Sequence, residues 1–100
     1  MKIKILPSAM QDLIDGYRFY EKQSKGVGEY FLDTLYSDID SLFISAGIHP
    51  IYYGKYHRLL SKRFPFAVYY LIENDTVLVF GILDCRRNPA WIRKRLRNKK

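Results

Sequence analysis

The sequence predicts an α+β protein with the element order β-α-α-β-β-β, followed by a short C-terminal helix. Three observations support this: a period of two at the start of the chain, two amphipathic helical periods over 8–46, and branched and aromatic runs over 56–84. A chain of 100 residues has the size of one domain with one core. We therefore expect a single domain over 1–100. In it, a helical hairpin packs on a small, mainly antiparallel twisted sheet, with a basic tail from about residue 86.

The opening stretch MKIKIL alternates lysine with isoleucine, which is typical of a half-exposed strand near a sheet edge. Pro7 breaks this strand. Ser8 and Gln11 then have the S-x-x-Q spacing of a capping box, so we expect a helix to begin at Ser8. Apolar residues at three- and four-residue intervals predict the core face of this helix, which consists of Met10, Leu13, Ile14, Tyr17 and Tyr20.

A second helix is predicted after the turn-forming sequence KQSKGVG. Apolar residues recur at helical spacing from Phe31 to Phe43, and we expect this helix to run to about Ala46. The positions of the two helices outside the apolar faces are rich in acidic residues, so we expect an acidic outer layer whose charge is opposite to that of the basic tail. Its members are Asp12, Asp15, Glu21, Glu29, Asp33, Asp38 and Asp40.

Residues 47–55 follow neither period, and we expect a loop there. The runs YHRLLSKRF, FAVYYLIE and TVLVFGIL are rich in branched and aromatic residues and predict three strands. Asn74 and Asp75 both tolerate positive φ and predict a tight hairpin turn. The FAVYYLIE strand is apolar on both faces, which favours a central position with the helices on one side and another layer on the other.

The C-terminal segment combines a helix start with a concentration of positive charge. Asn88 suits the N-cap and Pro89 the first position of a short helix. Residues 86–100 contain eight basic residues and no acidic residue, whereas residues 1–85 contain nine basic and ten acidic residues. This excess suits an acidic partner, either a nucleic acid or a protein, and the alternative is a solvated tail that keeps the protein in solution.

Several classes of protein are disfavoured by the composition. The longest apolar stretch, VLVFGIL, is too short to span a membrane, and MKIKIL is too short for a signal peptide, so we expect a cytoplasmic protein without membrane contact. Cys85 is the only cysteine in the sequence, and no Cys/His cluster suggests a metal site. No phosphate-cradling glycine loop is present, and we expect no cofactor.

Two stretches give the sequence a family likeness over essentially its whole length. The sequence RFPFAVYY enters the predicted central strand, and ILDCRRNP closes the last one, with Trp91 shortly after. Together with the element order, they resemble the RelE/ParE superfamily of toxins from bacterial type II toxin–antitoxin modules, closer to the ParE-like branch. The resemblance implies the RelE/ParE-like fold and a cognate antitoxin that silences the toxin.

The resemblance implies one of two activities. ParE-like toxins inhibit DNA gyrase and have no recognised hydrolytic residues. RelE-like toxins are ribosome-dependent mRNA endonucleases, for which the candidate catalytic residues here are His57, Arg63, Arg86 and Arg87. This chain has Phe66 and Ala67 where RelE-like toxins carry an arginine, and Trp91 where they carry a tyrosine. Because tryptophan cannot transfer a proton, the gyrase-directed activity is favoured.

The same resemblance and the charge pattern suggest which residues bind partners. Candidates for target binding are Arg58, Lys62, Arg63, Arg86, Arg87 and Trp91. Antitoxin binding is expected from an acidic segment that folds on contact with Arg86, Arg87, Trp91, Ile92 and Arg93. The toxin by itself is expected to be a monomer or weak dimer, and to form a hetero-oligomer with the antitoxin.

Two further possibilities stay open at this point. Tyr52, Tyr53 and Tyr56 lie beside Lys55 and Arg58, a mixture that nucleic-acid binders use for stacking, although tyrosines in a small domain more often serve packing. A third class of function is a basic nucleic-acid or protein-binding module without toxicity.

Overall fold

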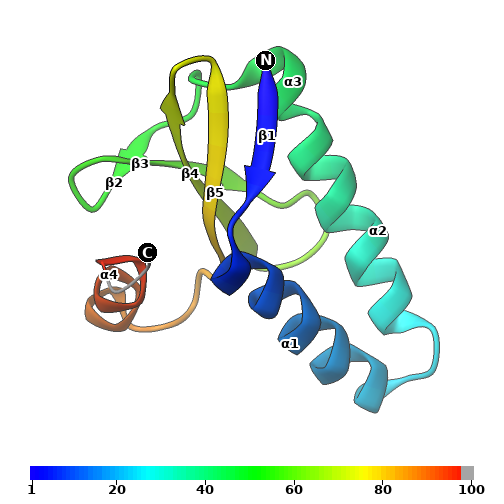
Figure 1. Cartoon of the computed structure of the whole chain (residues 1–100). Coiled ribbons are helices and arrows are strands. Elements are labelled where there is room, and N and C mark those ends of the chain that lie inside the picture. The colour runs from blue at the N-terminus through cyan, green and yellow to red at the C-terminus, as the bar shows by residue number, and fades with distance from the viewer. Residues whose placement is uncertain (98–100) are drawn as a thin grey trace.

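The computed structural model describes residues 1–97 and shows a mixed five-stranded sheet between two helical layers (Figure 1). The tail residues Lys99 and Lys100, counted in the charge above, lie outside the described residues. The elements in chain order are β1 (Lys2–Ile5), α1 (Pro7–Gln23), α2 (Val27–Asp40), α3 (Leu42–Ser45), β2 (Ile51–Tyr52), β3 (Tyr56–Leu60), β4 (Phe66–Glu73), β5 (Thr76–Asp84) and α4 (Pro89–Arg97).

The sheet has the strand order β1-β5-β4-β3-β2. The strand β1 lies at an edge and the sheet is mainly antiparallel, as the sequence predicted; the parallel pairing of β1 with β5 was not predicted. The turn between β4 and β5 also agrees with the prediction, since Asn74 and Asp75 adopt φ values of 50° and 64°. Positive φ at both positions gives the strand-matched twist that a two-residue hairpin requires. In the described part of the chain, no helix is long and apolar enough to cross a membrane.

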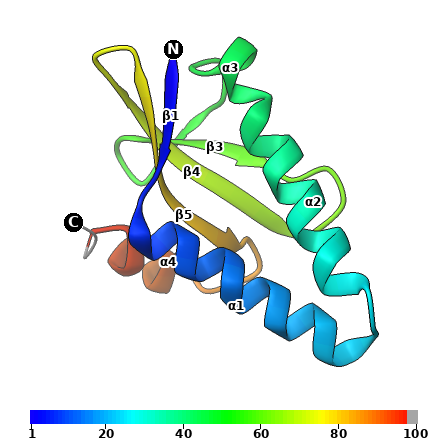
Figure 2. The same cartoon turned by 45° about the vertical axis from the view of Figure 1, so that its right-hand side comes forward.

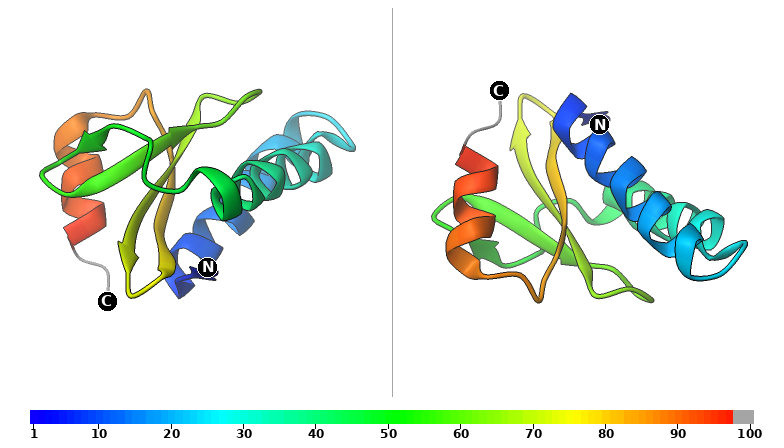
Figure 3. Two further views of the ribbon diagram at one scale, coloured as in Figure 1. Left: turned by 90° about the horizontal axis from the view of Figure 1, so that it is seen from above. Right: turned by 90° about the horizontal axis from the view of Figure 1, so that it is seen from below.

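The central strand β4 is buried on both faces, which confirms the prediction of a layer on each side. Val68 and Tyr70 pack against the hairpin of α1 and α2, whereas Ala67 and Tyr69 pack against α4. All four side chains are fully buried. Figure 3 shows the sheet between the helical hairpin on one side and α4 on the other. The chain therefore has two apolar clusters, one on each face of the same sheet.

The first helix differs from its sequence prediction in its start and in its buried face. Pro7 is the first helical residue, and Ser8 makes no capping hydrogen bond. Met10 and Ile14, expected in the core, are each 37% exposed. The reason is the close approach of the two helices at Gly16, where a Cβ atom would lie 2.5 Å from the Phe31 ring. Close packing at this small residue sets the rotation of α1, which periodicity does not encode.

Two other predictions need correction. The segment expected to be a loop contains β2, which pairs antiparallel with β3 and forms the other edge of the sheet. Its two residues are too few to show a period of two, so the sequence signal was absent. Phe43, expected in the core, is 55% exposed because the second helix ends at Asp40 and the short α3 follows.

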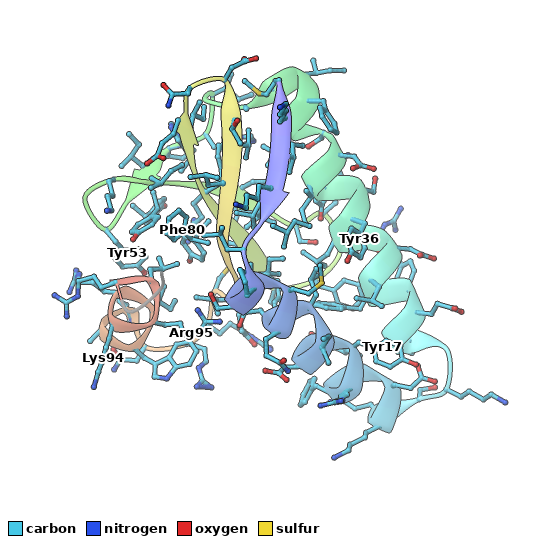
Figure 4. All side chains as sticks on the ribbon, viewed as in Figure 1. Tyr17, Tyr36, Tyr53, Phe80, Lys94 and Arg95 are labelled. Carbon is cyan, nitrogen blue, oxygen red and sulfur yellow. The ribbon has the colours of Figure 1, made fainter. Side chains whose placement is uncertain are left out.

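Two carboxylates assigned to the outer face are buried instead. Asp12 is 9% exposed and Asp38 is 2% exposed. The Oδ2 atom of Asp12 accepts a hydrogen bond of 3.0 Å from the backbone N–H of Ile82, and its Oδ1 atom is paired with the Arg95 guanidinium. Arg95, labelled in Figure 4, also donates to the carbonyl oxygen of Ser8 at 3.1 Å. Asp12 thus joins α1, β5 and α4, and part of the basic tail is tied to the acidic hairpin.

Replacing Asp12 with alanine should destabilise the fold, because Arg95 and the N–H of Ile82 lose their acceptor. We expect the free energy of unfolding to fall by about 3 kcal/mol, which is the lower end of the range for loss of one partner of a buried ion pair. Urea denaturation of Asp12→Ala and wild type would measure this. Asp15→Ala, an exposed change one turn away, should stay within about 0.5 kcal/mol of wild type. Equal losses in the two variants would contradict a bridging role for Asp12.

Candidate functional site

The end of β5 holds two arginines in a defined turn. Asp84 pairs with Phe66 of β4, and the N–H of Cys85 donates to the carbonyl oxygen of Pro65 at 2.8 Å. The N–H of Arg87 then donates to the carbonyl oxygen of Asp84 at 3.2 Å. The N–H of Ala90 donates to the side chain of Asn88 at 2.7 Å, which is the N-cap predicted from the sequence. The backbone is therefore fixed on both sides of the arginine pair.

The first arginine is paired with its own strand end. Asp84 Oδ1 accepts hydrogen bonds from the backbone N–H and the Nε of Arg86, at 2.8 and 3.0 Å. Asp84 Oδ2 accepts a further bond of 2.7 Å from the guanidinium. These hydrogen bonds from Arg86 hold the pKa of Asp84 below its ordinary value. Sequence reasoning missed this partner, although an aspartate two positions before an arginine is a detectable signal.

The second arginine lies on the only tryptophan of the sequence. The Arg87 guanidinium carbon is 3.7 Å from the centroid of the Trp91 ring, within the range of a cation–π contact. The first turn of α4 therefore positions Arg87. The two neighbouring arginines consequently have different surroundings, one held by a carboxylate and the other by an aromatic ring.

A cleft of about 340 Å³ opens beside Arg87, between α1, the end of β5 and the start of α4. We call it the Trp91 cleft. Two large aromatic side chains are exposed here, with Phe19 at 53% and Trp91 at 39%. Aromatic walls with a few polar groups are typical of sites that hold a side chain of a partner. The lining residues are Asp12, Asp15, Gly16, Phe19, Phe66, Ile82, Leu83, Asp84, Arg87 and Trp91.

Lys62 and Arg63 lie in the β3–β4 loop, which is at the same end of the sheet as the arginine pair because Phe66 pairs with Asp84. Phe64 anchors this loop to the hairpin. Its ring centroid is 4.8 Å from that of Tyr20 and 5.1 Å from that of Phe31. Both basic side chains are exposed beside α2. The structure therefore collects four of the predicted basic residues at one end of the sheet.

The remaining predicted cations lie on tyrosine rings of the α4 side of the sheet. Arg58 is 3.9 Å from the ring centroid of Tyr52, and Arg93 is 5.5 Å from that of Tyr53. Lys55 is 5.4 Å from the ring centroid of the buried Tyr56. The tyrosine cluster therefore packs against the protein's own cations.

Arg58 is also close to Tyr69, its partner in the β3–β4 register. Burial is the main cause that raises the pKa of Tyr69, to about 12. This hydroxyl therefore stays protonated at neutral pH.

The two expected apolar anchors of α4 differ in exposure. Trp91 is partly exposed in its cleft, whereas Ile92 is 1% exposed and packs with Leu96 in the cluster beneath α4. Adjacent helical residues point in directions about 100° apart, so one faces the sheet while the other faces solvent. Ile92 is thus out of reach of a partner while α4 stays docked on the sheet.

The structure places His57 away from the arginines. Its ring stacks on Tyr70 with centroids 5.0 Å apart, on the hairpin side of the sheet, and its Nδ1 is 2.8 Å from the carbonyl oxygen of His49. Tyr70 pairs with Val79, five positions before Asp84 on β5, which is roughly 16 Å along a strand. The candidate nuclease residues are therefore not collected in one place: Arg63 lies near the arginine pair and His57 does not.

Tyr70 instead holds a loop against the sheet. Its hydroxyl accepts a hydrogen bond of 2.9 Å from the N–H of Gly47 and lies 2.5 Å from Nδ1 of His49, to which it can donate when that ring is neutral. Burial, and secondarily the nearby His57, lower the pKa of His49. Both histidines are thus occupied in positioning the loop that leads to β2.

The α+β fold that the sequence predicted, of the RelE/ParE-like type, is present in the described residues, with β1 parallel to β5, a helical hairpin and a C-terminal helix. A chain of the solved structure "Chromosomal ParDE TA system from P. aeruginosa" is similar to this protein with a TM-score of 0.76. The match covers 82% of this chain and 92% of that chain, at 17% sequence identity. This protein therefore shares the fold of a chain of that ParDE system.

Comparison of the sequence with known families and curated proteins gives no match. Within residues 1–97, no three His, Cys, Asp or Glu side chains are grouped in a way that could hold a metal ion.

Acidification should weaken the fold through His49. The pKa of His49 is lowered in the folded protein, so the unfolded chain binds more protons as the solution is acidified. The full free energy of unfolding is therefore present above the unfolded pKa of 6.5, and part of it is lost as the pH falls through the pKa of the folded protein. Urea unfolding at pH 7.5, 6.5 and 5.5 would measure this loss. His49→Gln should reduce the dependence, whereas His57→Gln should keep most of it because burial of His49 is unchanged. The same slope in His49→Gln would contradict this assignment.

Proposed function

We propose that this protein is the toxin of a type II toxin–antitoxin module, that it inhibits DNA gyrase, and that a cognate antitoxin neutralises it in the cytoplasm. The observation that carries this proposal is the fold likeness to a chain of the ParDE system, which extends over 82% of this chain. The sequence RFPFAVYY and the arginine-rich strand end support the same branch independently of the overall topology.

The surroundings of the arginine pair support inhibition by binding. Cleavage of RNA requires a group that removes a proton from the 2′-hydroxyl and a group that protonates the leaving oxygen. Trp91 next to Arg87 cannot transfer a proton, and His57 is stacked on Tyr70 on the other side of the sheet. Arg87 in an aromatic cleft is instead suited to contact a carboxylate or phosphate of a large partner. We therefore assign target binding to Arg87 and Trp91, with Arg58, Lys62, Arg63 and Arg86 around them.

A specific observation favours the second candidate, an mRNA endonuclease of the RelE type. Lys62, Arg63, Arg86 and Arg87 lie at one end of the sheet, and such a group could hold a phosphodiester and stabilise charge on it. A third candidate, a basic binding module without toxicity, would use the same surface.

The antitoxin is proposed to bind with an acidic segment along the start of α4. Arg86, Arg87, Trp91 and Arg93 are exposed and provide charge and one aromatic anchor. Ile92 could contribute only if α4 leaves the sheet. Exposed apolar side chains on the hairpin, including Met10 and Ile14, offer further surface for a segment that folds on binding.

Expression in bacteria, with and without the candidate antitoxin, a small protein encoded beside this one, would test the proposal. We expect growth arrest that the small protein relieves, and inhibition of DNA supercoiling by purified toxin and gyrase. Codon-dependent cleavage of ribosome-bound mRNA with gyrase unaffected would favour the endonuclease instead. Unchanged growth in every case would leave the non-toxic binding module.

Arg87→Ala should reduce toxicity more than Arg86→Ala does. Arg87 is held at the Trp91 cleft, whereas one edge of the Arg86 guanidinium is already engaged by Asp84. We expect an inhibitory concentration about tenfold higher for Arg87→Ala, equivalent to about 1.4 kcal/mol of binding. Arg18→Ala, which removes an exposed charge from α1, serves as the matched control.

The double variant with alanine at 86 and 87 tests the whole strand end. It should lose most toxicity and only part of its antitoxin affinity, because the contacts of Trp91 and the hairpin remain. If this variant folds and stays fully toxic, the arginine pair is not the working site.

A further inference from the structure

Asp38 of α2 is a buried carboxylate without a partner for one of its oxygens. The residue is 2% exposed, and in the described structure its Oδ2 atom accepts no hydrogen bond. Asp12, the other buried carboxylate, contacts the Arg95 guanidinium and the N–H of Ile82. An unpaired carboxylate inside a protein is costly, so native structures normally give it a cation or hydrogen-bond donors. Asp38 therefore marks a place where such a group is missing.

Asp38 is one of the residues that line a hollow of about 330 Å³ between α2 and the β3–β4 loop. We call it the Asp38 hollow. The view in Figure 2 shows this loop beside α2. Phe64 keeps the loop there, with its ring centroid 5.5 Å from that of Tyr30. The lining residues are Tyr30, Asp33, Thr34, Ser37, Asp38, Lys62 and Arg63.

The protein's own cations do not neutralise Asp38. Lys62 and Arg63 line the same hollow, yet neither makes an ion pair with Asp38 among the contacts of residues 1–97. Both side chains are exposed. The hollow thus combines an unsatisfied buried carboxylate, a second carboxylate from Asp33, two hydroxyls and two solvated cations.

We propose that the Asp38 hollow binds an arginine or lysine side chain of a partner protein whose segment also carries a neighbouring carboxylate. Asp38 Oδ2 is closed to solvent in the free protein, so side chains at the rim of the hollow must move aside before the partner's cation can donate to it. Asp33 is the second carboxylate. The hydroxyls of Thr34 and Ser37 accept remaining N–H groups, and the half-exposed ring of Tyr30 lies beside the cation. Lys62 and Arg63 bind the adjacent carboxylate of the same segment.

Other ligands fit the hollow less well. A bare metal ion would find only two carboxylates and would be repelled by Lys62 and Arg63. A phosphate or an acidic side chain by itself would be repelled by the buried Asp38. A segment with both charges satisfies all four charged residues, which is the charge complementarity expected of a protein partner. The hollow shares Lys62 and Arg63 with the surface assigned to target binding, but recognition by Asp38 does not depend on whether the target is gyrase or mRNA.

Titration of purified protein with the blocked dipeptide N-acetyl-Arg-Glu-amide, followed by amide NMR, tests the proposal. We expect saturable shifts at Thr34, Ser37 and Lys62, with a dissociation constant on the order of 1 mM, as for a small fragment. The citrulline analogue has nearly the same shape without the charge and should bind at least tenfold more weakly. N-acetyl-Glu-amide should not shift the amides of α2.

Two variants of α2 provide the matched comparison. Asp38→Asn should reduce affinity for the arginine dipeptide at least tenfold, whereas Asp40→Asn removes the same charge from an exposed position and should leave it unchanged. Asp38→Asn should also raise the urea midpoint of the free protein, because an unpaired buried charge is removed.

Several outcomes would overturn the proposal. Equal binding of the arginine and citrulline dipeptides would show that the charge is not recognised. Unchanged affinity in Asp38→Asn would exclude the carboxylate. A lower urea midpoint in Asp38→Asn would mean that Lys62 or Arg63 already pairs with Asp38 in solution. Growth and supercoiling assays do not enter this test, so the toxin proposal and the Asp38 hollow can fail independently.

Discussion

The Asp12 carboxylate connects the three layers of this protein, and the candidate site depends on that connection. It contacts the backbone of β5 and the guanidinium of Arg95 on α4. Packing of Ile92 and Leu96 under α4 supplies the apolar part of the same attachment. Trp91 can form a wall of its cleft only while α4 is docked, because the opposite wall comes from α1. The bridge made by Asp12 therefore supports the shape of a cleft that Asp12 also lines.

The positive charge of the C-terminal segment is organised by specific contacts. Arg86 is held by Asp84, Arg87 by Trp91, Arg93 by Tyr53 and Arg95 by Asp12. Each of these four guanidinium groups thus has a specific neighbour, and the neighbours differ in chemistry. An arginine held by an aspartate has already used one of its hydrogen-bonding edges, whereas an arginine on an aromatic ring keeps all of its donors for a partner. Net charge attracts acidic partners, but these neighbours decide which cations can bind them.

The two buried carboxylates illustrate how burial and pairing separate structural from functional roles. Asp12 has a cation and a backbone donor, which is the usual arrangement for a structural buried charge. Asp38 is more deeply buried, and one of its oxygens has no donor within the described structure. A group kept at a cost to folding is a candidate for binding, because a partner can supply what the fold does not. On this chain, that contrast points to α2 and the β3–β4 loop as a second interaction surface.

Except for the short elements α3 and β2, the sequence by itself determined the order of helices and strands. It also determined the Asn74–Asp75 turn, the Asn88 N-cap and the burial of β4 on both faces, because these depend on local conformation and on apolar periodicity. It also located the arginine pair at a strand end. Tertiary structure decided the rest. The close approach of Phe31 to Gly16 set the rotation of α1 and exposed Met10. Long-range contacts paired Arg95 with Asp12 and separated His57 from the arginines, since charges far apart in sequence meet only when layers pack. Periodicity assigns a polar residue to an outer face, whereas its true surroundings depend on which element packs there.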